Sequence, residues 1–247
     1  MVNFAVAFIQ YLATITNFTK ILKNKIMVKK EIYNFLKELK SNNNRDWFHA
    51  NKEKYNYAKH EFENLVNSFI IEIAKFDNNI RNILAKDCIF RIFKDVRFSK
   101  DKTPYKPNFG AYIVKGGKKS GFAGYYIHIE PDKSFLGGGV YMPQSAELKS
   151  IRQEIFENVD DFKQIITNRS FNKYFSEIYG EKLKNPPRGF NKEFPDIELL
   201  KFKSFTVIHE LSNEEIHGEL FIKKSIEIFK LMKPFNDFIN HAIAYTK

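Results

Sequence analysis

Cysteine, arginine and tryptophan are scarce in this chain of 247 residues. The single cysteine, Cys88, excludes a disulfide framework and any zinc or iron–sulfur site built from several cysteines. Neither GxxxxGK[ST] nor GxGxxG is present, which excludes the two standard nucleotide-binding loops. The six histidines show no HExxH or HxxxH spacing, so the sequence predicts no metal site and points to no particular cofactor.

What is present is an ordinary globular composition, with 43% hydrophobic and 28% charged residues. The formal net charge is +11, but only seven of the 40 basic residues are arginine. Nucleic-acid surfaces favour arginine for bidentate contacts with phosphates and bases. A lysine excess spread along the chain is more typical of a solvated surface, so nucleic-acid binding is less favoured than contact with an anionic small molecule.

The first 28 residues are apolar and carry no charge before Lys20. A signal peptide needs a basic start, and a membrane span needs about twenty nearly uninterrupted apolar residues. Polar residues interrupt this stretch, so we expect residues 1–28 to be an extension outside the core, with Met27 as the natural start. An amphipathic anchor is the alternative. Residues 29–247 are predicted to form one domain, in the cytoplasm and with no membrane span.

Along the chain, helices are predicted before and after a central sheet. Apolar residues at helical spacing indicate a helix over residues 28–40 and a long one over residues 55–76, and Asp46 is predicted to cap the short helix between them. Pro143 is expected to open another helical region, and Ser212 to cap a helical tail.

The strand predictions cover five segments with alternating or short apolar runs, namely residues 88–98, 109–114, 122–130, 134–142 and 201–209. Short links between consecutive strands favour an antiparallel sheet, with a mixed sheet as the alternative. In the third of these strands Tyr125, Ile127 and Ile129 should share one face, and Tyr126, His128 and Glu130 the other. The fold class is therefore α+β, with helices packed on a central sheet.

Residues 89–106 are the densest polar segment of the chain. If they begin as a strand, Arg91, Phe93, Asp95 and Arg97 share one face, and Phe90, Ile92, Val96 and Phe98 share the other, which we expect to be core. Two guanidiniums on one face can hold a phosphate or carboxylate, with Asp95 fixing one of them. The candidate ligand-binding residues are Arg91, Asp95, Arg97, Ser99, Lys100, Lys102, Tyr105, Lys106, Gly137, Gly138 and Gly139.

Each of these features has a structural alternative. The charged segment is about as consistent with an Arg–Asp network that ties a strand to a loop. Three glycines in a strand more commonly serve packing or a bulge than a pocket wall. Among acid–base groups, Asp95, His128 and Glu130 are weak candidates. No catalytic residue is assigned.

The run from Phe90 to Lys106, followed by the three glycines with Tyr141 and Pro143, resembles the conserved bacterial and fungal family called domain of unknown function 2461. The resemblance covers roughly residues 30–245. It also includes Asn43 to Phe48 with Asn51 and Tyr55, then Leu148, Ile151 and Arg152, residues 187–190 and residues 201–205. Arg188 stands where the family usually has lysine, which keeps the charge. The resemblance implies kinship and no established activity.

Two functions are therefore expected from the sequence. The first is a soluble binder of, or an enzyme acting on, an anionic small ligand, of which a phosphorylated compound is one example. The second is a nucleic-acid or protein interaction module that uses the same basic surface. A closed pocket with the cations inside favours the first, and a flat basic face with exposed aromatics favours the second. The sequence does not give the oligomeric state.

Overall fold

The N-terminal helices form where the sequence places apolar residues at helical spacing. The computed structural model describes residues 28–246. Helix α2 spans Lys30–Ser41, α3 spans Arg45–Ala50 and α4 spans Lys52–Ile73. The apolar stripe of α2 is fully buried, and α4 buries one side along its whole length. The two predicted helices are thus present, with ends shifted by a few residues.

The predicted cap of the short helix is wrong. Asn44, and not Asp46, accepts a hydrogen bond from the backbone N–H of Trp47 through its side chain, at 2.9 Å. Asn44 has the extended backbone that a capping residue needs, whereas Asp46 already lies in the first turn. An acidic residue in the first turn still interacts favourably with the helix dipole.

The sheet has four antiparallel strands in the order β1-β2-β3-β4, which confirms the predicted α+β fold. Their bounds are β1 Phe109–Ile113, β2 Gly124–Ile129, β3 Ser134–Val140 and β4 Phe205–Leu211. Ile127 pairs with Ala111 on β1 and with Leu136 on β3, so β2 is central and paired on both sides. The last strand begins four residues later than predicted.

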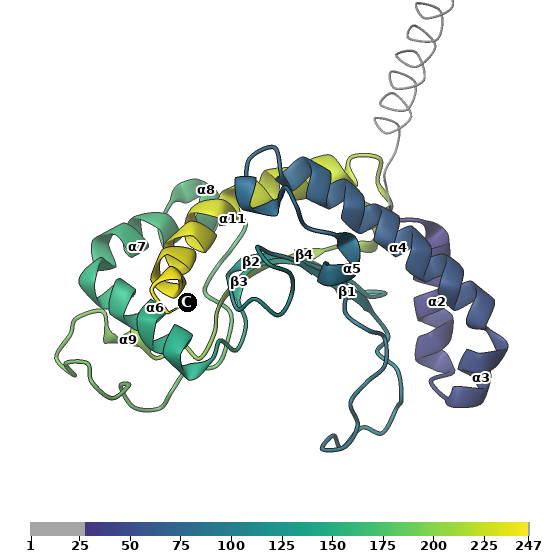
Figure 1. Ribbon diagram of the computed structural model, residues 1–247, viewed down its shortest axis with the longest axis horizontal. Helices are drawn as coiled ribbons and strands as arrows, with labels where there is room; N and C mark the ends of the chain where they lie inside the picture. The colour runs from purple at the N-terminus through teal and green to yellow at the C-terminus, as the bar shows by residue number, and fades with distance from the viewer. Residues whose placement is uncertain (1–27, 247) are drawn as a thin grey trace, which may run out of the picture.

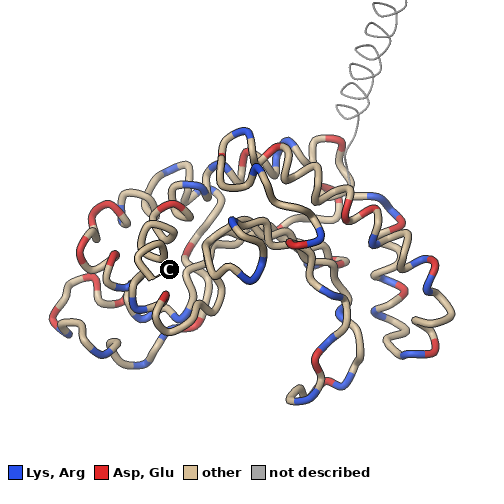
Figure 2. The backbone as a smooth tube through the Cα atoms, viewed as in Figure 1, with Lys and Arg blue, Asp and Glu red and all other residues tan. Residues whose placement is uncertain are grey.

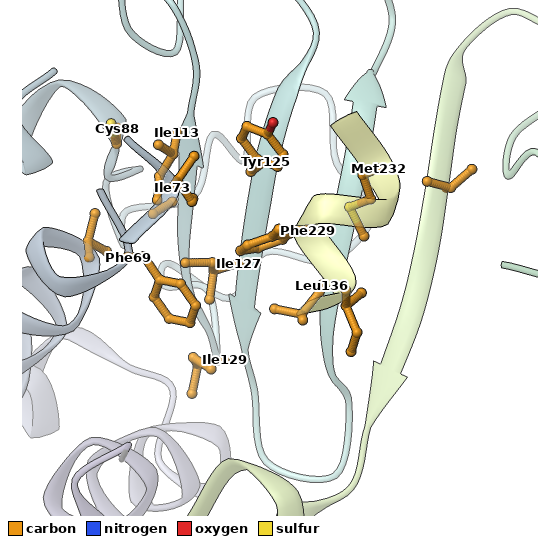
Figure 3. Close-up of a cluster of buried hydrophobic side chains, with 14 of the residues drawn as sticks. Phe69, Ile73, Cys88, Ile113, Tyr125, Ile127, Ile129, Leu136, Phe229 and Met232 are labelled. Atoms are coloured by element: carbon orange, nitrogen blue, oxygen red, sulfur yellow. The ribbon is translucent and has the colours of Figure 1, made fainter. Parts of the chain in front are cut away.

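One face of the sheet is covered by helices and contains the core. Figure 1 shows α4 and the C-terminal helix α11, Phe221–Ala244, lying across this face. Tyr125, Ile127 and Ile129 of β2 point into the layer beneath them, where they meet Phe229 of α11 and Phe69 of α4 (Figure 3). The predicted alternation of faces along β2 is therefore correct.

Several further helices are present in the described residues. They are the 3₁₀ turn η1 at Asn78–Ile80, α5 at Ala85–Cys88, α6 at Ser145–Glu157, α7 at Val159–Ile166, α8 at Arg169–Asn172, α9 at Ile197–Leu200 and α10 at Asn213–His217. Ser212 caps a helix, as predicted, by accepting from the backbone N–H of Glu215 at 3.2 Å. That helix is the short α10, however, and the predicted helical tail is a separate helix, α11, which begins at Phe221.

Residues 88–98 do not form the predicted strand. Cys88 ends α5, and residues 89–108 form a projecting loop that we call the arm (Figure 1). An isolated bridge from Phe93 to Tyr105 joins its two sides, and another from Ile89 to Ala111 joins its base to β1. Of the residues predicted to face the core, only Ile92 is buried, and Phe98 is 96% exposed. No other element packs over the outer part of the arm. Side chains that alternate along it are therefore exposed on either side, and neither side becomes part of the core.

The described core begins at Val28, the last residue of the predicted extension. Val28 is fully buried, and its backbone N–H donates to the carbonyl of Ile216 at 3.2 Å. The rest of the predicted extension lies outside the described residues. Within residues 28–246, no helix has the length and apolar character needed to span a membrane.

Candidate functional site

The open face of the sheet, opposite the helices, carries a pocket of about 690 Å³. This volume lies within the range of small-ligand sites. Residues from the base of the arm, all four strands, the loop after β1, the start of α6 and the segment before β4 that carries Tyr179 line it. They include Phe90, Lys106, Asn108, Tyr112, Lys118, Lys119, Tyr126, His128, Phe135, Gly137, Gly138, Gly139, Tyr141, Glu147 and Tyr179.

Polar side chains of β2 form part of the pocket floor. Tyr126 and His128 project to the same side because they are two residues apart on one strand. The Tyr126 hydroxyl lies 3.1 Å from Nδ1 of His128, and Nε2 of His128 lies 3.1 Å from Oε2 of Glu130. The His128 ring stacks on Phe135 with the ring centres 4.5 Å apart. These contacts fix the imidazole in one orientation.

Burial changes the acid–base behaviour of this floor. Desolvation lowers the pKa of His128, and the Glu130 carboxylate offsets part of that effect. Desolvation, with a contribution from the charge of Glu130, raises the pKa of Tyr126 to about 12. At neutral pH the floor therefore presents a neutral imidazole next to a neutral phenol.

The pocket walls carry more positive than negative charge. Lys106, Lys118 and Lys119 line it, against one acidic residue, Glu147. The Glu147 carboxylate accepts from the backbone N–H of Gln144 at 2.9 Å at the start of α6. Lys106 Nζ lies 5.8 Å from the ring centre of Phe90. Burial and the neighbouring charge of Arg91 lower the pKa of Lys106. An anion bound next to this ammonium group would stabilise its charged form.

The three glycines of β3 form both a pocket wall and a packing surface. A Cβ on Gly137 would lie on the pocket side, 3.5 Å from Cβ of Tyr126. A Cβ on Gly138 would lie 2.7 Å from Sδ of Met232 in α11, so this glycine allows the helix to approach the sheet. Gly139 has a φ of +98°, which favours glycine. The packing explanation therefore applies to Gly138, and the pocket explanation applies to Gly137 of the same strand.

Most of the other predicted site residues lie on the arm, outside the pocket lining. Figure 2 shows basic and acidic residues interspersed along it. Its outer part carries Asp95, Arg97, Ser99, Lys100 and Lys102, while Arg91 lies nearer the base. The structure thus brings Lys106 and Gly137–Gly139 together, and it does not bring Arg97 or Lys102 to them.

Arg97 and Asp95 form an exposed pair on the arm. The Arg97 Nε donates to Asp95 Oδ1 at 3.0 Å, and an Nη donates to Oδ2 at 2.7 Å. These hydrogen bonds hold the pKa of Asp95 below its usual value and raise the pKa of Arg97. The Arg97 side chain is 76% exposed. Asp95 therefore does fix one guanidinium, as the sequence predicted, but at the surface.

Tyr105 has a structural position. It is buried, and its ring stacks on Phe48 at 4.0 Å. Asn43 joins both its backbone groups, accepting from the N–H at 3.1 Å and donating to the carbonyl at 2.9 Å. Tyr105 thereby anchors the arm to the loop before α3.

Several pocket residues were not among the sequence candidates. Asn108, Tyr112, Lys118 and Lys119 reach the pocket through the pairing of β1 with β2, which local patterns do not reveal. Tyr126 could have been found, because the alternation of β2 already placed it beside His128 and Glu130. Within residues 28–246, no group of three or more His, Cys, Asp or Glu side chains is arranged to hold a metal ion.

His209 and Cys88 lie outside the pocket lining. His209 is on β4, with its Nδ1 3.4 Å from the carbonyl oxygen of Tyr174. Cys88 is buried, and burial raises its pKa to about 11, which keeps the thiol protonated and unreactive at neutral pH.

Comparison with known proteins identifies the family. No curated protein and no solved structure matches this chain. The model of a family described as "Conserved hypothetical protein (DUF2461)" matches residues 31–238. This range contains all four strands, the arm and every residue named above for the pocket. The chain therefore belongs to the conserved family DUF2461, as its central motif indicated.

Proposed function

We propose that this protein binds an anionic small molecule with a flat apolar part, in the pocket on the open face of the sheet. The observation that carries the proposal is the combination of three lysines with aromatic walls around one cavity of ligand size. Lys106, half-buried beside Phe90, is the cation best placed to contact the anionic group. The aromatic rings of Phe90, Tyr126 and Phe135 provide flat apolar surface.

The glycine segment of β3, Gly137–Gly139, supports the same proposal. Over Gly137–Gly139 the strand presents backbone to the pocket, so a ligand can lie against the sheet without meeting side chains. The cytoplasmic location expected from the sequence remains part of this proposal.

The test is calorimetric titration with phenyl phosphate, which joins an anionic group to a flat ring. We expect Lys106→Ala to lower affinity about tenfold to a hundredfold, because a hydrogen bond to a charged group contributes about 1.5–3 kcal/mol. Lys102→Ala is the matched control, since Lys102 donates to the carbonyl of Val96 on the arm. Its affinity should equal that of the unchanged protein.

The opposite pattern would contradict the pocket. If Lys102→Ala and Arg97→Gln weaken phenyl phosphate binding while Lys106→Ala does not, the anion site lies on the arm. Inorganic phosphate serves as a second titrant, and we expect it to bind more weakly because it gains nothing from the aromatic walls.

A second candidate function is binding of single-stranded nucleic acid at the arm. Phe98 is 96% exposed, and Arg97 lies over its ring at 5.9 Å. Exposed aromatic rings among cations are typical of surfaces on which bases stack. In that case a short oligonucleotide should bind with a steep salt dependence, and Phe98→Ala should weaken it while Lys106→Ala should not.

A further inference from the structure

The open face of the sheet holds a chain of three hydrogen-bonded side chains that anion binding alone does not use. Tyr126 and His128 of β2 and Glu130, the residue that follows the strand, are spaced two apart, and each contacts the next. The distances are 3.1 Å from Glu130 Oε2 to His128 Nε2 and 3.1 Å from His128 Nδ1 to the Tyr126 hydroxyl. Tyr126 and His128 line the pocket, and Glu130 lies behind them.

The partners of the imidazole determine its tautomer. Glu130 is a carboxylate and can only accept, so Nε2 of His128 carries the proton. Nδ1 faces two donors, the Tyr126 hydroxyl and the Asn108 amide Nδ2, which lies 3.4 Å away. Nδ1 therefore presents a lone pair, and the Tyr126 O–H points at it.

The site holds this arrangement rigidly. Phe135 stacks on the imidazole with the two rings 14° from parallel. Gly110 of β1 lies beside the phenol, and a Cβ there would come within 2.5 Å of the Tyr126 hydroxyl oxygen. The absence of a side chain at Gly110 thus leaves the room in which the hydroxyl reaches His128.

Burial keeps both groups neutral before a ligand binds. Desolvation lowers the pKa of His128 and raises that of Tyr126. A neutral imidazole whose Nδ1 lone pair faces the Tyr126 O–H is able to accept that proton, and the carboxylate behind it stabilises the imidazolium that forms.

We propose that Glu130, His128 and Tyr126 form a proton relay, in which the Tyr126 oxygen takes a proton from a weakly acidic hydroxyl of the bound ligand. The ligand O–H bond breaks as a new O–H bond forms at Tyr126. The original Tyr126 proton moves to Nδ1 of His128, and the imidazolium lies against Glu130. The ligand becomes an oxyanion in a pocket with three lysines. The ligand class is therefore a phenol or an enol.

This inference rests on the proposed function, and its first test needs no ligand. Nitrogen-15 NMR distinguishes imidazole tautomers. We expect His128 to be protonated at Nε2 only. His209 and His217 are internal references, because their Nδ1 atoms lie 3.4 and 3.2 Å from backbone carbonyl oxygens and should carry the proton. A proton on Nδ1 of His128 would overturn the relay.

The second test uses 4-nitrophenol, whose anion is coloured and whose neutral form is not. At a pH where the free probe is mostly protonated, we expect the bound probe to absorb as the phenolate. The NMR signals of His128 should change to those of an imidazolium. In His128→Gln and Tyr126→Phe the probe should bind as the neutral phenol, and His209→Gln should behave like the unchanged protein.

The outcomes separate the two ideas. The relay is contradicted if the probe binds but stays neutral, or if it ionises in His128→Gln as much as in the unchanged protein. Neither result contradicts ligand binding in the pocket. If 4-nitrophenol does not bind while phenyl phosphate does, the relay is overturned and the anion site is unaffected. If neither binds, the proposed function is contradicted as well. Circular dichroism checks that each variant folds, and Tyr126→Phe, which removes one oxygen only, serves if His128→Gln does not.

Discussion

Two neighbouring glycines of β3 differ in what a side chain would meet. At Gly138 a Cβ would lie 2.7 Å from Met232 Sδ and 3.0 Å from two Met232 carbons, whereas at Gly137 its nearest neighbours are 3.5 Å away. We expect Gly138→Val to lower the free energy of unfolding by about 1–3 kcal/mol, the usual cost of overpacking a core. Chemical denaturation measures this change.

Gly137→Ala is the matched control for that substitution. Its Cβ fits at ordinary contact distance on the pocket side, so stability should change little while phenyl phosphate affinity falls. Equal destabilisation by both substitutions would mean that the two glycines do not face opposite sides of the sheet.

A further residue-scale prediction concerns Asp95. Its pKa is held below the ordinary value of 3.8 chiefly by the side-chain hydrogen bonds from Arg97. In Arg97→Gln we expect the pKa of Asp95 to move up towards that value, as followed by carboxyl NMR during a pH titration. The pKa of Asp101, which pairs with Lys94 on the same arm, should not move. An unchanged Asp95 would mean that the pair does not form in solution.

At the scale of elements, α11 is joined to the sheet by a buried amide. Asn236 accepts from the backbone N–H of Gly139 at 2.7 Å and donates to the carbonyl of Gly124 at 3.1 Å. Asn236→Leu leaves both backbone groups buried without these partners, at about 1–3 kcal/mol for each. We expect a large fall in the free energy of unfolding, measured by denaturant titration.

Asn240 offers the matched comparison one turn later. It makes the same two kinds of bond with Ala123 but is only half-buried. Asn240→Leu should therefore cost less, because water can replace the lost partner. If Asn240→Leu costs as much as Asn236→Leu, burial does not decide the difference.

The elements that the sequence predicted best are those whose pattern reflects a real core face. Strand β2 alternates between Tyr125 in the core and Tyr126 in the pocket, and the alternation was visible in the sequence. The arm carries a similar alternation, but Phe98 is 96% exposed because nothing packs over it. A local pattern does not report whether a second layer exists.

Local sequence patterns also identified only part of the candidate site. Lys106 and Gly137–Gly139 were predicted, because glycines and clustered lysines stand out in a sequence. Asn108 and Lys119 were missed, since they join the pocket only through the register of β1 with β2. Arg97 stood out equally, but it lies on the arm and outside the pocket lining.

For the whole molecule, the buried histidine predicts how stability depends on pH. Burial holds the pKa of His128 below its ordinary value of 6.5 in the folded state, so the unfolded chain binds more protons at mildly acidic pH. The stabilising contribution is complete above about that value and is lost as the pH falls towards the folded pKa. We expect the melting temperature to fall over this range.

The variant His128→Gln should show a weaker dependence of melting temperature on pH over the same range. A pH dependence that persists in full in His128→Gln would assign it to other groups.

The three glycines of β3 lie between the pocket and helix α11. Over Gly137–Gly139 a single layer of peptide separates the sulfur of Met232 from the pocket. A ligand in the pocket and helix α11 in the core therefore contact opposite sides of the same backbone segment. A substitution such as Met232→Leu, which touches no ligand, should alter affinity by moving the wall itself. The shape of the binding surface is set from inside the core.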